Sequence, residues 1–297
     1  MEQDILKTLA YYQALGNMPL SLIEIQRFMP NKQEGENIPL FDIQKSLEHL
    51  VKIGSVQTKN GFFYLNNNPH KDPYTARINN LKTTHKKWGQ INASGKFLVY
   101  IPYIRGVYIT GSVALGNASE NSDLDILIKT QSSRIWSARF MVVALSMVLG
   151  KRRYKNKINN RLCFNQYITE DSEYLGPPNI NHIIENIKIP LWSDSKNESR
   201  KKSIYNFNAN RFGLLVKKTI EILLYISALG WLMEKLIGWM QIKKIQHNET
   251  EYPTKILPLT IKTNNLIFYY PSVLETEKKY FTILDSLKNQ YLNKERL

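Results

Sequence analysis

The stretch Val107–Lys129, VYITGSVALGNASENSDLDILIK, constrains the fold of this chain more than any other. It opens with a short apolar run, Val107–Thr110, which is long enough for one buried strand. The pair Gly111–Ser112 follows, and then a polar connection rich in Gly, Asn and Ser runs over Gly116–Ser122. The segment Asp123–Ile128 alternates acidic and apolar residues, which is typical of a second strand. The stretch therefore predicts two strands joined by a glycine-containing polar turn.

Two carboxylates lie on one face of the second predicted strand. Side chains alternate across a strand, so Asp123 and Asp125 share a face that Leu124 and Ile126 do not. Neighbouring carboxylates repel each other and are costly to bury unpaired. A divalent cation relieves both costs, and hard oxygen ligands suit Mg²⁺, which one or two carboxylates and substrate phosphates commonly hold. We therefore expect a metal site at Asp123 and Asp125.

The order strand, Gly-Ser, polar turn and Asp-x-Asp strand, carried by GSVALGNASENSDLDI, resembles the polymerase beta-like nucleotidyltransferase superfamily. It is most similar to the minimal nucleotidyltransferases and the aminoglycoside adenylyltransferases, which share the spacing and the Ser-Asp-x-Asp ending. The resemblance covers Arg105–Thr169. It implies an α+β fold in which a small mixed β-sheet core is packed by helices. The flanking segments predict a winged-helix-like domain before this core and a mostly helical region after it.

The resemblance also implies roles for these residues. Asp123 and Asp125 would bind Mg²⁺, or Mn²⁺ in its place, and Asp123, Asp125 and Asn165 would form the catalytic group. A nucleoside triphosphate, with ATP as the expected one, would lie against the turn between the strands. The residues expected to contact it are Gly111, Ser112, Gly116 and Ser122. The glycines allow close approach of the backbone, since they carry no Cβ.

The third expected strand, Arg161–Thr169, departs from the superfamily pattern. Relatives place a third acid there, which orients or deprotonates the attacking hydroxyl, but the central positions here include Asn165. The first acids, Glu170 and Asp171, come after the strand. An amide oxygen can bind a metal but is no general base. Either the base comes from elsewhere, or the site binds nucleotide and turns over slowly, or it is catalytically reduced. Leu115, where many relatives carry an arginine, is a second departure.

Alternation along this third strand offers two faces. One would carry Cys163, Asn165 and Tyr167, and the other Phe164, Gln166 and Ile168. The second set is mainly large and apolar, so we expect it to pack on the helix that follows the second strand. The first set then faces the aspartates and places Asn165 at the site.

The chain organisation predicts four parts. These are a winged-helix-like domain at 1–69, a connecting helix at 70–101, the nucleotidyltransferase core at 102–175 and a mostly helical region at 176–297. In the first part three helical runs precede Asn60–Gly61, the strongest short hairpin signal. The third run mixes Asp42 and Glu48 with Lys45 and Lys52, which favours a docking or dimerisation module over a DNA reader.

Two helical segments have an unusual apolar content. Ser132 or Ser133 is expected to cap a helix that ends near Leu149 and is apolar enough to be buried. The segment Phe212–Met240 is also strongly helical, and its uncharged, mostly apolar run Ile222–Met233 is too short to favour a membrane span. It is expected to be a core helix or a protein interface, and its tryptophans and lysines leave a membrane-surface helix as an alternative.

The net charge of +15 limits the partners. It fits attraction to nucleic acid, nucleoside triphosphate or anionic lipid, and equally a lysine-rich surface from a biased composition. A single cysteine, Cys163, excludes an internal disulfide, and the first residues lack the features of a signal peptide, so we expect a cytoplasmic protein. The leading hypothesis is a Mg²⁺-dependent nucleotidyltransferase that acts on a small-molecule, protein or RNA hydroxyl. The alternative is a nucleic-acid-binding or regulatory protein with a catalytically reduced nucleotidyltransferase fold.

Overall fold

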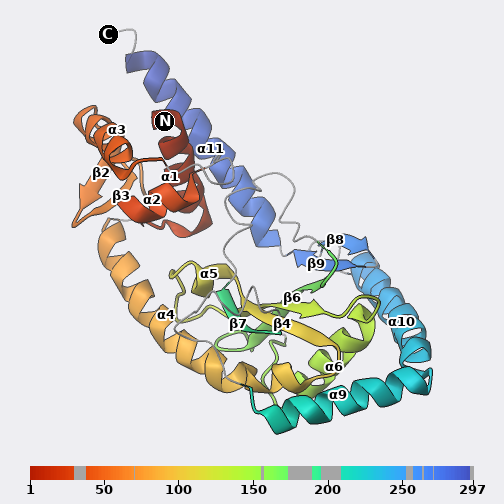
Figure 1. Cartoon of the computed structure of the whole chain (residues 1–297). Helices are drawn as coiled ribbons and strands as arrows, with labels where there is room; N and C mark the ends of the chain where they lie inside the picture. The colour runs from red at the N-terminus through yellow and green to blue at the C-terminus, as the bar shows by residue number, and fades with distance from the viewer. Residues whose placement is uncertain are drawn as a thin grey trace. The chain divides into compact units, whose positions relative to one another are not determined.

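The computed structural model describes residues 1–29, 38–69, 71–154, 157–172, 189–194, 209–251, 257–262, 264–269 and 271–294. These residues belong to two compact units (Figure 1). The first unit contains the described residues within 1–80 and 272–297, and the second those within 81–174 and 187–271. Each unit is described by itself below.

The first unit has three short helices, a hairpin and the last helix of the chain. Its elements are α1 (Glu2–Gly16), β1 (Leu20–Ser21), α2 (Leu22–Phe28), α3 (Leu40–Lys52), β2 (Val56–Lys59), β3 (Phe62–Leu65), the start of α4 (Pro73–Gly95) and α11 (Pro271–Lys294). Among the described residues, one sheet of this unit has the strand order β1-β3-β2. Ser21 and Glu24 form a capping box that starts α2. Asn60 and Gly61 both have positive φ, which the tight hairpin turn requires.

The expected helices and hairpin of the first unit are therefore present, while the winged-helix fold itself stays a prediction. The core of the unit is built from the apolar faces of α1, α2 and α3, with Ile5, Ile25 and Leu47 fully buried. The last helix also packs here, since the rings of Tyr11 and Tyr280 meet edge to face at 5.8 Å.

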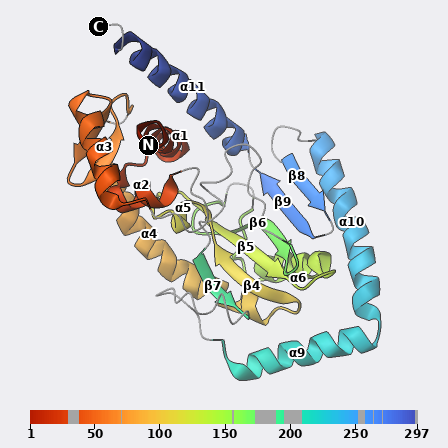
Figure 2. The same cartoon turned by 45° about the horizontal axis from the view of Figure 1, so that its top comes forward.

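The second unit holds one mixed sheet and the helices that pack on it (Figure 2). Its elements are the rest of α4, η1 (Lys96–Tyr100), β4 (Ile104–Ile109), α5 (Gly111–Ala114), β5 (Leu124–Thr130), α6 (Ile135–Val148), β6 (Leu162–Thr169), β7 (Ile189–Ser193), α9 (Arg211–Ile226), α10 (Leu229–Glu251), β8 (Leu257–Lys262) and β9 (Asn265–Tyr269). Among the described strands the order is β7-β4-β5-β6-β9-β8, in which only the β5–β6 pair is parallel. The expected α+β fold with a small mixed sheet is confirmed.

The two faces of this sheet differ. One face carries Val107, Ile126 and Ile128, which join Trp88 of α4 and Val142 of α6 in the main core. Burying these side chains stabilises the unit by roughly 2 kcal/mol each. The opposite face has a smaller apolar cluster of Tyr108, Leu127 and Ile168. Asp125 is two residues from Leu127 on β5 and therefore belongs to this second face.

Helix α6 differs from its prediction in two ways. Neither Ser132 nor Ser133 caps it; the N-cap residue is Arg134, and the carboxylate of Glu234 on α10 accepts hydrogen bonds from the backbone N–H groups of Trp136 and Ser137 at 2.9 and 2.8 Å. A carboxylate from another helix thus satisfies the amides that a serine would otherwise serve.

Burial of α6 is also only partial, because only one side of the helix packs against other elements of the unit. Phe140 and Val148 are exposed, and they border an apolar groove of about 520 Å³ with Tyr100 of η1. Among the described residues no helix combines the length and apolar character needed to cross a bilayer.

Candidate functional site

Gly111 ends the first central strand in a conformation that glycine favours. It follows β4 with φ +62° and starts the four-residue helix α5. A Cβ at this position would lie 2.1 Å from Oδ2 of Asp125, which is far inside van der Waals contact. The absence of a side chain is therefore what allows Asp125 to lie directly against the turn.

Hydrogen bonds hold the turn that follows. The N–H of Asn117 donates to the carbonyl of Ser112 at 2.8 Å, and Gly116 has φ +70°. Ser122 Oγ accepts from the N–H of Ser119 at 3.0 Å, so its hydroxyl is engaged within the turn. The N–H of Ala118 donates to a buried threonine of α4, which ties the turn to that helix.

Lys87 of α4 binds the residues that lead into β5. It is 2% exposed, and Nζ donates to the carbonyls of Glu120 and Ser122 at 3.1 and 2.7 Å and to Oδ1 of Asn160 at 2.8 Å. Burial lowers the pKa of this ammonium, while Asp123 and Glu120 oppose that shift. The sequence shows Lys87 only as half of a basic pair, so pattern reading missed its inward position.

The two aspartates have different partners. Asp123 precedes β5, and its Oδ2 forms an ion pair with Nη1 of Arg153 at 2.6 Å. Asp125 Oδ1 accepts a hydrogen bond from Nδ2 of Asn165 at 3.0 Å. Burial, and then the nearby charge of Asp123, raise the pKa of Asp125 to about 7, although Arg153, Asn165 and Cys163 act to lower it. The site therefore holds more negative charge than its protein partners balance.

Cys163 completes this cluster of potential ligands. Its Sγ and one carboxylate oxygen each of Asp123 and Asp125 all lie within 4.8 Å of one another. Nη1 of Arg153 is 3.9 Å from the same sulfur. In the part of the chain that the structure describes, no third carboxylate joins this cluster.

The acids that follow β6 lie at the other end of the strand. Asp125 pairs with Cys163, whereas Thr130 pairs with Thr169, in the parallel β5–β6 ladder. Glu170 accepts a hydrogen bond from the N–H of Ser132 at 3.4 Å, beyond the end of β5. These acids are therefore positioned away from Asp123 and Asp125.

A bulge in β6 overturns the expected alternation of that strand. Asp125 pairs with Cys163 but Leu127 pairs with Gln166, so β6 has one extra residue in this interval. Cys163 and Asn165 still reach the aspartates. Tyr167, however, is buried in the main core on the opposite face of the sheet. The prediction for Tyr167 is wrong because the bulge shifts the side-chain parity of the rest of the strand.

The same bulge divides the set that was expected to pack on α6. Phe164 does pack against the main core. Ile168 instead joins Tyr108 and Leu127 on the face of the sheet that bears Asp125. Gln166, paired with Leu127, shares that face.

The two carboxylates of this cluster suit a hard divalent cation. Two carboxylates supply oxygen ligands, as Mg²⁺ and Mn²⁺ prefer. The raised pKa of Asp125 and the guanidinium of Arg153 on Asp123 both indicate that added positive charge stabilises this cluster. Arg153 was visible in the sequence only as part of a basic loop, and no local signal identifies it as the partner of Asp123.

Comparisons with known proteins agree with this geometry. Residues 94–203 match the family model of the nucleotidyltransferase domain. No curated protein and no solved structure matches the chain. The matched segment includes the strands and turn that carry Gly111, Asp123 and Asp125, and it supports nucleotidyl transfer as the general chemistry.

Proposed function

We propose that this protein is a Mg²⁺-dependent nucleotidyltransferase that moves a nucleoside monophosphate from an NTP, with ATP as the expected donor, to a hydroxyl acceptor and releases pyrophosphate. One observation carries the proposal: within the segment that matches the nucleotidyltransferase domain, Asp125 lies against a glycine turn and beside Asp123. A glycine turn next to paired carboxylates suits the binding of phosphate and metal together.

Each part of the site has a distinct role in this proposal. Asp123 and Asp125 hold the cation, which when bound neutralises phosphate charge and lowers the pKa of the acceptor hydroxyl. Gly111 and Ser112 present backbone N–H groups to the triphosphate, with Gly116 and Ser122 shaping the rest of the turn. Binding of a cation replaces the proton that Asp125 retains near neutral pH.

Asn165 acts as a positioning residue here. Its amide N–H holds Oδ1 of Asp125, which orients that carboxylate. An amide cannot accept the proton of the attacking hydroxyl, so another group must take that proton. The same observation favours a second candidate, a regulatory protein that binds nucleotide through a catalytically reduced site.

The test incubates the purified chain with each α-³²P-labelled NTP, Mg²⁺ or Mn²⁺ and candidate acceptors, and follows label on RNA, on protein and in small products. Asp125→Asn should abolish transfer. Asp171→Asn is the matched control, because it removes a carboxylate from the other end of β6. Metal-dependent nucleotide binding without transfer supports the regulatory candidate. Absence of both binding and transfer contradicts the proposed site.

The first unit is proposed to be a winged-helix module that docks or dimerises and does not read DNA sequence. The support is the mixed charge of α3, where Asp42 and Glu48 stand among Lys45 and Lys52. The full chain should bind duplex DNA weakly and without sequence preference. Sequence-selective binding that Lys45→Gln and Lys52→Gln abolish would contradict this, and its salt dependence would measure the phosphate contacts.

A further inference from the structure

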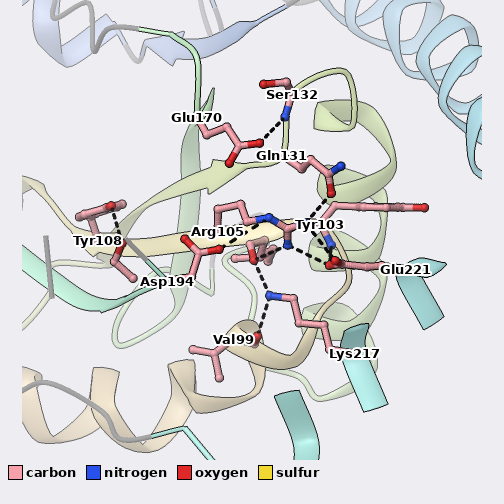
Figure 3. A network of polar contacts seen from close by, with 12 residues as sticks. Val99, Tyr103, Arg105, Tyr108, Gln131, Ser132, Glu170, Asp194, Lys217 and Glu221 are labelled. Atoms are coloured by element: carbon pink, nitrogen blue, oxygen red, sulfur yellow. Dashed lines mark hydrogen bonds and ion pairs between the residues drawn. The ribbon is translucent and has the colours of Figure 1, made fainter. Parts of the chain in front are cut away.

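Helix α9 is attached to the second unit by its charged residues (Figure 3). Lys217 is 5% exposed; its Nζ donates to the carbonyls of Val99, at 3.1 Å, and Ile104, and lies 4.8 Å from the centre of the Trp192 ring. A buried lysine that serves two backbone carbonyls fixes which side of the helix faces the sheet.

Glu221, one turn further along α9, forms the second attachment. Both carboxylate oxygens pair with the guanidinium of Arg105, each at 2.9 Å, and Oε1 also accepts from the N–H of Tyr103 at 2.5 Å. Paired N–H···O bonds of this kind are directional. The two charged residues thus turn the polar side of α9 inward, the reverse of the usual arrangement for a surface helix.

The outward side of α9 and the helix that follows it is apolar. We call this surface the α9–α10 face. Figures 1 and 2 show α9 and α10 as two successive helices along the second unit. Its exposed large side chains are Phe212, Leu215, Val216, Ile220, Ile222, Leu223, Tyr225, Ile226, Leu229, Trp231, Leu232, Leu236, Trp239 and Met240. Tyr225 and Ile226 are 76% and 75% exposed. Large apolar side chains exposed in this number on successive turns of two helices indicate a site of interaction with a protein or a membrane.

The aromatic residues of α10 are paired with lysines. Nζ of Lys235 lies 4.0 Å from the centre of the Trp231 ring, and Nζ of Lys243 lies 4.0 Å from that of Trp239. Tryptophan rings with adjacent ammonium groups are suited to the level of lipid headgroups, where one side of the ring is apolar and the other polar.

The charges of the α9–α10 face have one sign. The two acids within residues 211–247 both point inward, Glu221 to Arg105 and Glu234 to the start of α6. The exposed charged residues of this range are Arg211, Lys218, Lys235, Lys243 and Lys244. In a dimer formed through this face, the cations of one copy would lie close to those of the other and repel them. The net charge of +15 on each chain adds to this repulsion. An anionic surface complements them.

We infer that the α9–α10 face binds the surface of an anionic lipid bilayer, with both helices lying in the interfacial plane. The apolar side chains would enter the headgroup boundary and the lysines would contact the headgroups. Phe212–Met240 was expected to be a core helix or a protein interface; most of its apolar side chains are exposed, which contradicts a core helix, and this assignment takes the membrane-surface alternative over the protein interface.

The test measures co-sedimentation of the full chain with vesicles of phosphatidylcholine alone or mixed with phosphatidylglycerol. The wild type should bind the mixed vesicles, and bind less as salt increases. Trp231→Ser with Trp239→Ser should lower the partition coefficient at least about tenfold, and Lys235→Glu with Lys243→Glu should lower it by about tenfold or more. Phe41→Ser is the matched control, because Phe41 is 75% exposed but belongs to the first unit, and it should change nothing.

Two results would overturn the inference. One is failure to bind either vesicle; analytical ultracentrifugation that then finds dimers, which the tryptophan variant dissociates, would assign the face to a second copy. The other is vesicle binding that the tryptophan variant leaves unchanged, because the net charge alone would then account for it. Circular dichroism of each variant checks that the fold is retained.

Discussion

The second unit contains two clusters of charged side chains whose charge balance differs. Around α9, Glu221 faces Arg105 through two hydrogen bonds of 2.9 Å, so opposite charges are matched. At the end of β4, Asp125 lies near Asp123, and the guanidinium of Arg153 forms its ion pair with Asp123. Burial, and then the charge of Asp123, raise the pKa of Asp125.

The comparison distinguishes two roles of charged residues: the residues around α9 stabilise the fold, and the aspartates at the end of β4 are suited to bind a ligand. A matched, partly buried pair stabilises its element, because removal of either partner leaves the other uncompensated. A site with surplus negative charge is costly in the free protein and becomes favourable when a cation arrives. Perturbed carboxylates of this kind concentrate at functional sites. The predictions below test this contrast, from the largest effect to the smallest.

Asp125→Asn should lower nucleotidyl transfer by at least about 10³-fold, because several kcal/mol of metal-mediated charge stabilisation is lost. The free energy of unfolding should hold or rise, since a carboxylate with a raised pKa is removed. Transfer assays and chemical denaturation measure the two quantities. A marked loss of stability would place Asp125 with the structural charges.

Asn165→Asp would add a third carboxylate beside Asp125. If the enzyme lacks only its base, the transfer rate should rise about ten- to a thousandfold, given general-base contributions of roughly 10²–10⁴. If the site works without that base, the main effect should be tighter metal binding. The metal-free variant should be less stable, because the amide that donates to Asp125 becomes a like charge. Rates at several Mg²⁺ concentrations decide, and a variant equal to wild type in rate and metal affinity would remove Asn165 from the site.

Glu221→Gln should lower the free energy of unfolding by about 3 kcal/mol, the lower end for a broken buried pair, because Arg105 and Glu221 are 17% and 14% exposed. Urea denaturation measures this. Lys218→Gln, at an exposed position of the same helix, is the control and should change stability by less than about 0.5 kcal/mol. A Glu221→Gln protein as stable as the control would show that the network does not anchor α9.

The buried Lys217 beside Glu221 and Arg105 should make the free energy of unfolding depend on pH. Burial lowers its pKa from 10.5 to about 8, so between these values the unfolded chain binds more protons than the folded one. The free energy of unfolding should therefore rise with pH over that window, by roughly 1–3 kcal/mol. The measurement is denaturation near pH 8 and pH 10 for wild type and Lys217→Met. Equal pH slopes in the two proteins would contradict it.

The sequence alone predicted the features that depend on the conformation of neighbouring residues. The two-residue period of a strand placed Asp123 and Asp125 together, and the cluster of their side chains agrees. Asn60–Gly61 predicted the hairpin because both residues tolerate positive φ. The amide at Asn165 could also be read directly, and it does contact Asp125. Each of these inferences needs only the conformation of neighbouring residues.

Tertiary structure decided the rest, since partners far apart in the chain meet only through packing. The bulge in β6 moved Tyr167 to the core, and a strict two-residue period cannot reveal an inserted residue. Arg153 pairs with Asp123, 30 residues away in the sequence. Glu234, which caps the start of α6 in place of a serine, lies almost 100 residues away. The residue types of α9 were visible from the start, but its orientation depends on ion pairs with Arg105, which no pattern within the helix encodes.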